Sequence, residues 1–154
     1  GELALLVGYG PTIALGAAYV QSGRFSALAG LAGLVPGLLM WSMILVNEIP
    51  DYAEDRRARK MNLTVRLGPA RARWLYIASL SGVYAFIAGG IIAGVFPAWA
   101  WLALGSLPFA LRSFRIVHRH YLHPRMMAAA NQAMVVTYSS TMLLFCVGFY
   151  LASP

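Results

Sequence analysis

Acidic side chains are scarce in this sequence. Only 5 of its 154 residues are Asp or Glu, and none follows Asp55. Charged residues of both signs make up 11% of the chain, whereas 60% of residues are hydrophobic. So little charge, with a mean hydropathy of +0.67 and long apolar runs, excludes an ordinary soluble domain and predicts an integral membrane protein.

Cysteine is almost absent as well, and the single Cys146 excludes an intramolecular disulfide. The chain has 12 Lys and Arg and a formal net charge of +7. In a soluble protein this excess would suggest a nucleic-acid partner. In a membrane protein, cations are first explained by topology, so we expect the lipid bilayer as surroundings and no nucleic acid.

Five apolar segments are candidate membrane spans, and each must satisfy its backbone hydrogen bonds internally, as a helix does. They cover roughly residues 3–20, 27–47, 74–96, 97–111 and 126–151. The fourth is short for a span, which needs about 20 residues. The sequence therefore predicts an all-α polytopic transmembrane helix bundle, with residues 1–154 as one domain.

The cations are distributed unevenly along these spans. Eleven of the 12 lie in or beside two segments, 48–73 and 112–125, which five spans place on the same face of the membrane. Only Arg24 falls on the opposite face. Because cytoplasmic loops retain Lys and Arg, both segments are predicted to be cytoplasmic. Attraction to anionic lipids is a further consequence of the charge.

The stretch NEIPDYAEDRRARK, residues 47–60, holds four of the five acids. Asn47, Asp51 and Asp55 are spaced i, i+4 and i+8, so a continuous helix would present them in one column of oxygens. Pro50 is expected to kink this helix. Carboxylate and amide oxygens suit Mg²⁺, which is often shared with substrate phosphates. The alternative is that these acids only form interfacial i, i+4 pairs with arginines.

NEIPDYAEDRRARKMNLTVRLG resembles the second aspartate-rich motif of the UbiA superfamily of intramembrane prenyltransferases. That pattern reads approximately N-[DE]-x-x-D-x-x-x-D, then a Lys, then T-x-x-V-R-L-G. Upstream, GELALLVGYGPTIALGAAYVQSGRFS resembles the preceding helix of the 1,4-dihydroxy-2-naphthoate prenyltransferase branch. The resemblance covers residues 1 to about 68. It departs from the pattern at Arg59, where a Gly is common, and at Met61 and Asn62.

The resemblance implies a role for each motif residue. Asn47, Asp51 and Asp55 would hold Mg²⁺ against the diphosphate of an isoprenoid donor, which makes Asp51 and Asp55 the catalytic acids. Lys60 and Arg66 would contact the diphosphate. An aromatic acceptor would then take up the prenyl group, as in the synthesis of menaquinone-type quinones.

The resemblance also implies a larger assembly. Family members have about nine transmembrane helices, so we expect this chain to be the C-terminal half, with the first aspartate-rich motif in a missing N-terminal half and no activity alone. The expected location is a bacterial or archaeal plasma membrane, with the active site facing the cytoplasm. Two alternatives stay open: a non-catalytic membrane helix bundle, and a UbiA-type enzyme with a different acceptor.

Overall fold

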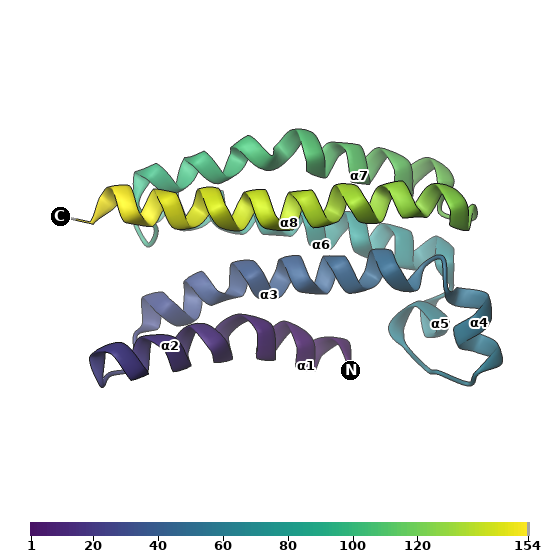
Figure 1. Ribbon diagram of the computed structural model, residues 1–154, viewed down its shortest axis with the longest axis horizontal. Helices are drawn as coiled ribbons and strands as arrows, with labels where there is room; N and C mark the ends of the chain where they lie inside the picture. Colours follow the sequence, from purple (N-terminus) through teal and green to yellow (C-terminus); the bar gives the residue numbers. More distant parts are fainter. Residues whose placement is uncertain (154) are drawn as a thin grey trace.

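The computed structural model describes residues 1–153, and these form helices and connecting turns without any strand. Long helices run antiparallel along one axis (Figure 1). The elements in chain order are α1 (Glu2–Val7), the π-helical turn η1 (Gly8–Thr12), α2 (Ile13–Ser22), α3 (Ala27–Glu48), α4 (Tyr52–Arg57), α5 (Leu63–Leu67), α6 (Pro69–Ile92), the 3₁₀ helix η2 (Ala98–Ser106), α7 (Leu107–His120) and α8 (Pro124–Ala152). The prediction of an all-α bundle is confirmed.

Four helical segments are long and apolar enough to cross a membrane: Glu2–Ser22, Ala27–Glu48, Pro69–Ile92 and Pro124–Ala152. The fourth expected span, residues 97–111, is not among them. Its apolar residues are divided between η2 and the first turn of α7, and α7 then carries Arg112, Arg115 and Arg119. The apolar run is therefore too short for an independent span. The chain from η2 through α7 nevertheless runs beside α8 for most of the length of the bundle (Figure 1).

Close helix packing depends on glycines. A Cβ on Gly37 of α3 would lie 2.5 Å from the backbone oxygen of Leu6, and one on Gly10 would lie 2.6 Å from the oxygen of Gly33. At the opposite side of the bundle, a Cβ on Gly148 of α8 would lie 2.6 Å from the backbone oxygen of Trp99. Small residues let helices approach closely where lipid offers no hydrophobic driving force.

Hydroxyl groups join the later helices to one another. The Tyr76 hydroxyl of α6 lies 2.6 Å from Ser113 Oγ of α7, which donates to the Ala130 carbonyl of α8 at 2.9 Å. Ser106 Oγ lies 2.7 Å from Thr141 Oγ1. These groups satisfy one another across four elements and fix the relative heights of α6, η2, α7 and α8.

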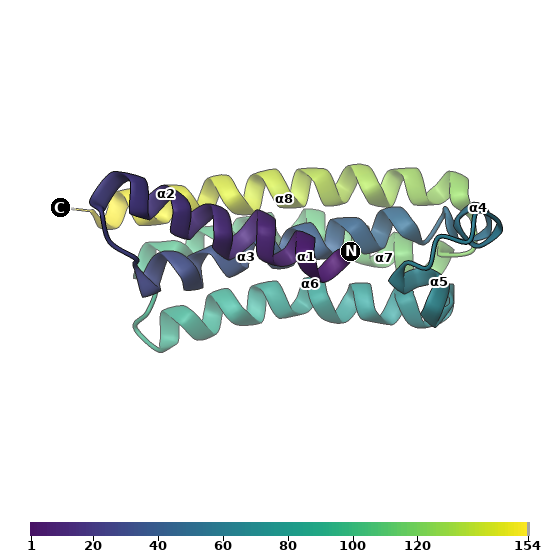
Figure 2. The same ribbon diagram turned by 90° about the horizontal axis from the view of Figure 1, so that it is seen from below.

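Both basic segments lie at the same end of the bundle. The α4 and α5 helices are at one end, together with the turn between α7 and α8, whereas the connections α2–α3 and α6–η2 lie at the other (Figures 1 and 2). This arrangement agrees with the uneven distribution of cations. Which side of a membrane this end faces stays a prediction.

Candidate functional site

The helix that carries the acidic motif breaks inside it. α3 ends at Glu48, and α4 begins at Tyr52, directly after Asp51. Pro50 lies in the intervening turn, where its missing N–H and its ring interrupt the helical hydrogen bonds. The expected single column of three oxygens is therefore not formed: Asn47 belongs to α3, whereas Asp55 lies on the separate helix α4.

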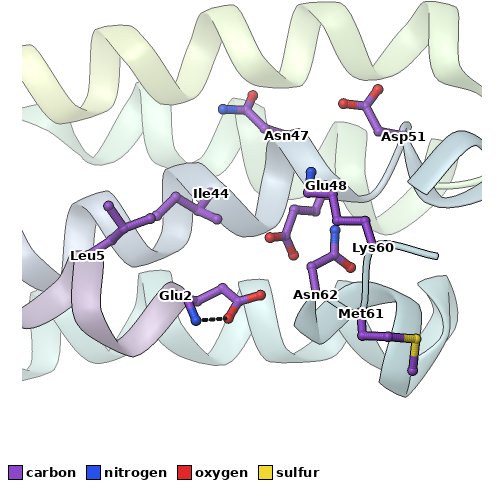
Figure 3. Close-up of a pocket in the computed structure, with 10 residues that line it drawn as sticks. Glu2, Leu5, Ile44, Asn47, Glu48, Asp51, Lys60, Met61 and Asn62 are labelled. Atoms are coloured by element: carbon purple, nitrogen blue, oxygen red, sulfur yellow. Dashed lines mark ion pairs between the residues drawn. The ribbon is translucent and has the colours of Figure 1, made fainter. Parts of the chain in front are cut away.

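Asn47 and Asp51 line a cavity of about 520 Å³ at this end of the bundle. Its walls come from α1, the end of α3 and the loop before α5, and its other lining side chains include Glu2, Leu5, Ile44, Glu48, Lys60, Met61 and Asn62. Figure 3 shows Asn47 and Asp51 pointing to the same side of α3, whereas Glu48 points the other way, toward Asn62. Two of the three predicted metal ligands thus share one cavity.

A second cavity of about 340 Å³ adjoins the same two residues. Asn47, Pro50 and Asp51 form one wall, and α8 forms the other with Asn131 and its apolar neighbours. Asn47 and Asp51 therefore lie between α8 and the loop segments, where a ligand in either space would meet them.

Several buried oxygens at this site have no partner. Asn47 Oδ1, Glu48 Oε2 and Thr64 Oγ1 are enclosed without a hydrogen bond among the described residues. Glu48 is 8% exposed and Thr64 is fully buried. Because a buried polar atom without a partner costs free energy, such atoms commonly mark a place for a ligand or water. Asn47 Oδ1 is the oxygen expected of a Mg²⁺ ligand, and it fits that group.

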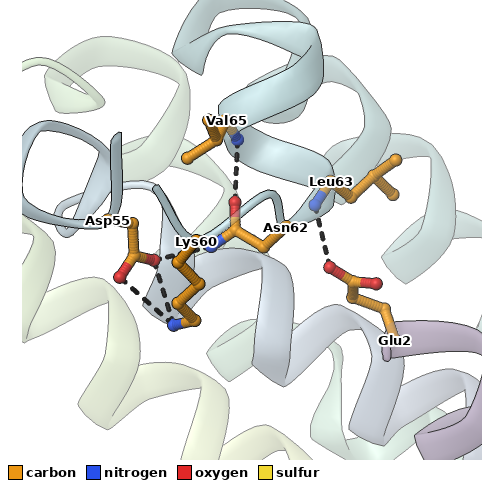
Figure 4. A network of polar contacts seen from close by, with 6 residues as sticks. All are labelled: Glu2, Asp55, Lys60, Asn62, Leu63 and Val65. Carbon is orange, nitrogen blue, oxygen red and sulfur yellow. Dashed lines mark hydrogen bonds and ion pairs between the residues drawn. The ribbon is translucent and has the colours of Figure 1, made fainter. Parts of the chain in front are cut away.

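The carboxylate of Asp55 is bound by side chains of its own loop. Lys60 Nζ lies 3.1 Å from Asp55 Oδ2, and Asn62 Nδ2 donates to the same oxygen at 2.6 Å. Asn62 Oδ1 in turn accepts from the Val65 backbone N–H at 2.8 Å and caps α5 (Figure 4). The hydrogen bond to Asp55 raises the pKa of the Lys60 ammonium group. Asp55 therefore organises the loop in this structure.

The loop between α4 and α5 contains a non-glycine residue with a positive φ. Arg59 has a φ of 56°, in the left-handed region that glycine adopts most easily. The Lys60 N–H then closes onto the Asp55 carbonyl at 2.9 Å, which ends α4. The departure from the family pattern at Arg59 thus falls at the residue where a glycine would be least strained.

The two predicted phosphate-binding cations are in different places. Lys60 lines the cavity that contains Asn47 and Asp51. Arg66 does not line it: its Nε donates to the Met61 carbonyl at 3.1 Å, and it borders a separate space of about 270 Å³ beside Trp41. The structure therefore brings together Asn47, Asp51 and Lys60, and leaves Asp55 and Arg66 at the margin.

Within residues 1–153, no three His, Cys, Asp or Glu side chains are grouped in a way that could hold a metal ion. What this chain offers is an amide oxygen and a carboxylate beside one cavity. That is a partial ligand set, of the kind that Mg²⁺ completes with phosphates and water.

Glu48 is the residue that the sequence interpretation did not assign. It lies within residues 47–60, but it is not at one of the i, i+4 and i+8 positions of Asn47, Asp51 and Asp55. The available signal is its position at the end of an apolar span, since an ionisable residue there usually faces protein or a cavity. Asn131 of α8 also lines the second cavity, and the motif spacing gave no signal for it.

Comparison with known proteins supports the resemblance. A model described as UbiA prenyltransferase family matches residues 1–136. The chain is 36% identical over 115 residues to a 1,4-dihydroxy-2-naphthoate octaprenyltransferase of Mycobacterium tuberculosis, covering 73% of this chain and 38% of that protein. It is 28% identical over 152 residues to the protein of that name from Escherichia coli, covering 99% of this chain and 49% of the relative.

A 2-carboxy-1,4-naphthoquinone phytyltransferase of Synechocystis is also similar, with 24% identity over 149 residues, 97% of this chain and 48% of that protein. The chain thus spans about half or less of the length of these relatives. No solved structure matches it significantly.

Proposed function

Because the chain belongs to the UbiA prenyltransferase family, we propose that it forms one side of a Mg²⁺-dependent site that transfers a prenyl group from an isoprenoid diphosphate to an aromatic acceptor. The acceptor is a quinone precursor of the naphthoate class, which is the chemistry named in the relatives. The second candidate, a non-catalytic helix bundle, is favoured only by the engagement of Asp55 within its own loop.

The observation that carries the proposal is the unpartnered Oδ1 of Asn47 beside Asp51 in a cavity. An amide oxygen and a carboxylate beside one space are suitable ligands for a hard divalent cation. A buried amide oxygen without a partner among the described residues is a place where a ligand or a water can bind.

The reaction needs the bond between the allylic carbon and the diphosphate oxygen to break, with the electron pair leaving on pyrophosphate. The ring of the acceptor then forms the new carbon–carbon bond and loses a proton, or carbon dioxide where the bond forms at a carboxylated ring carbon. Mg²⁺ would supply charge stabilisation to the leaving pyrophosphate. Asn47 and Asp51 would hold the metal ion that faces the diphosphate end of the donor, and Lys60 adds a point charge at the cavity wall.

Whether Asp55 binds the metal depends on its contacts with Lys60 and Asn62. Its carboxylate is shared by Lys60 and Asn62, so it joins the metal ligands either through its remaining lone pairs or by giving up one of these partners. Release of Lys60 is the easier change because its side chain is 60% exposed. The freed ammonium group then lies at the cavity, where an anionic diphosphate would attract it.

The charges also favour an orientation for the whole protein. The end of the bundle that carries the cavity holds most of the cations, which supports a cytoplasmic location for the site in a bacterial membrane. The apolar helices suit a substrate and product with long hydrocarbon tails, which enter and leave through the bilayer.

Binding of geranyl diphosphate to the 154-residue chain in lipid nanodiscs tests the proposal. We expect calorimetric binding that needs Mg²⁺ and disappears with EDTA. Asp51→Asn should weaken it about ten- to a hundredfold, as expected when a charged ligand contact is lost. Glu54→Gln is the matched control, because Glu54 is exposed on α4 and lines neither cavity. Equal affinity in Mg²⁺ and in EDTA, or an equal loss of affinity in Asp51→Asn and Glu54→Gln, would favour the non-catalytic bundle.

A further inference from the structure

The outward face of α7 is a stripe of three arginines, Arg112, Arg115 and Arg119. Their spacing of three and four residues puts them on one side of the helix, and all three are exposed. The opposite side of α7 is buried against the bundle through Ala110, Ser113 and Val117. The stripe therefore points away from the helices that α7 packs against. α7 itself lies along one edge of the bundle (Figure 1).

The described part of this chain supplies no carboxylate for these arginines. No Asp or Glu follows Asp55, so α6, α7 and α8 contain no carboxylate side chain. Among residues 1–153, the ion pairs are those of Lys60 with Asp55 and of the amino terminus with Glu2. An anionic partner for the stripe therefore comes from outside the described part of this chain.

Exposed tryptophans indicate the depth of the stripe in a bilayer. Trp99 packs beside Gly148 on α8, and Ser113 contacts Ala130 on the same helix. Eighteen residues of α8 separate these two levels, which is about 27 Å at the rise of an α-helix. Trp74 lies beside His118, with ring centroids 5.3 Å apart, and this is about 8 Å farther along the axis.

The two tryptophans are thus about 35 Å apart along the bundle, more than the hydrocarbon thickness of about 30 Å and less than the full bilayer of about 40–45 Å. Trp74 is 52% exposed and Trp99 is 55% exposed, as expected for aromatic residues at the two headgroup regions. Arg119 is at the level of Trp74, and Arg112 is about 10 Å deeper. The stripe therefore crosses the boundary between hydrocarbon and headgroups.

Neighbouring side chains make this edge rigid. Arg73 packs over the rings of Trp74 and Tyr121, with its guanidinium carbon 5.0 Å and 4.3 Å from their centroids. It also donates to the His118 carbonyl at 3.3 Å. These contacts hold α7 against α6 at the headgroup level.

We propose that the arginine stripe of α7 binds the phosphate groups of an anionic phospholipid, such as phosphatidylglycerol, in the leaflet at the α4–α5 end of the bundle. Arginines at this depth extend toward the headgroups and meet phosphates there. A zwitterionic lipid brings its own cation beside the phosphate, so charge complementarity favours the anionic lipid. This site is on the opposite side of α7 from the bundle and does not depend on the proposed reaction.

Native mass spectrometry of the 154-residue chain, released from a neutral detergent, measures this directly. Phosphatidylglycerol should bind more tightly than phosphatidylcholine of the same chains. Replacing all three arginines by Gln should weaken the binding of phosphatidylglycerol by roughly a hundredfold, since each cation near an anionic headgroup contributes about fivefold. The matched control is the triple variant Arg56→Gln, Arg57→Gln, Arg59→Gln, which removes the same charge from the α4 segment.

Three results decide the proposal. Selective weakening in the α7 variant, with inorganic phosphate unable to displace the lipid, supports it. Equal weakening in both triple variants would show a general charge effect and overturn it, as would equal affinity for the two lipids. If the triple variant does not fold, the single changes Arg115→Gln and Arg115→Lys replace it. The lysine should then retain more binding than the glutamine, and equal affinity of these two variants would also contradict the proposal.

Discussion

Asp55→Asn should loosen the segment from α4 to α5, whereas Asp51→Asn should not. Asp55 is the acid that the loop uses: its side chain is 14% exposed and accepts from Lys60 and Asn62. Asn62 also caps α5, so the interaction connects the two short helices. Asp51 is exposed beside the cavity.

The size of the effect follows from the two contacts. A hydrogen bond to a charged acceptor contributes about 1.5–3 kcal/mol, and an exposed ion pair contributes about 0.2–1 kcal/mol. Asparagine retains a neutral acceptor, so we expect the segment to lose about 1–2 kcal/mol of local stability. This corresponds to an open population about five- to thirtyfold larger.

Limited trypsin digestion measures that population, because the segment contains Arg56, Arg57, Arg59 and Lys60. When opening and closing are fast relative to cleavage, the cleavage rate follows the open fraction. Asp55→Asn should be cleaved about five- to thirtyfold faster at these residues, and Asp51→Asn and the control Glu54→Gln should stay within about twofold of the unchanged protein.

Cleavage of Asp55→Asn at the unchanged rate would refute the structural role given to Asp55. Faster cleavage of Asp51→Asn would contradict its assignment to the cavity. The geranyl diphosphate titration is separate from this measurement, so a loop effect and a loss of metal binding can be told apart for each acid.

Three further predictions concern the rest of the chain. Arg59→Gly should raise the melting temperature slightly, by the equivalent of about 0.5–1 kcal/mol, because it relieves the positive φ, and a lower melting temperature would contradict the loop geometry. Gly37→Ala should cost about 1–3 kcal/mol in a detergent melt because its Cβ would overlap the backbone of α1, whereas Gly16→Ala, with open space around it, should not; equal costs would argue against this packing. In a cysteine-free background, a cysteine at Ala58 should react only from the cytoplasmic side and one at Gly23 only from outside, and the reverse pattern would disprove the predicted topology.

The sequence alone was informative about the helices and the identity of the motif. Apolar runs predicted the spans that became α1–α2, α3, α6 and α8, because hydropathy over about 20 residues is a local property that lipid enforces directly. The prediction of a membrane span was wrong for residues 97–111, because the apolar run ends at Arg112 and the helix changes type at Ser106. The spacing of Asn47, Asp51 and Asp55 indicated a site, but only on the assumption of a continuous helix.

Tertiary structure decided how the motif is used. The break at Pro50 leaves Asn47 and Asp51 beside the cavity and moves Asp55 onto α4, where Lys60 and Asn62 engage it. The loop is also fastened from a distance, since the Leu63 N–H donates to Glu2 Oε1 at 2.8 Å across 61 positions of sequence. Spacing and hydropathy describe neighbours along the chain, whereas a partner for a carboxylate is chosen by which groups the folded chain brings within about 3 Å.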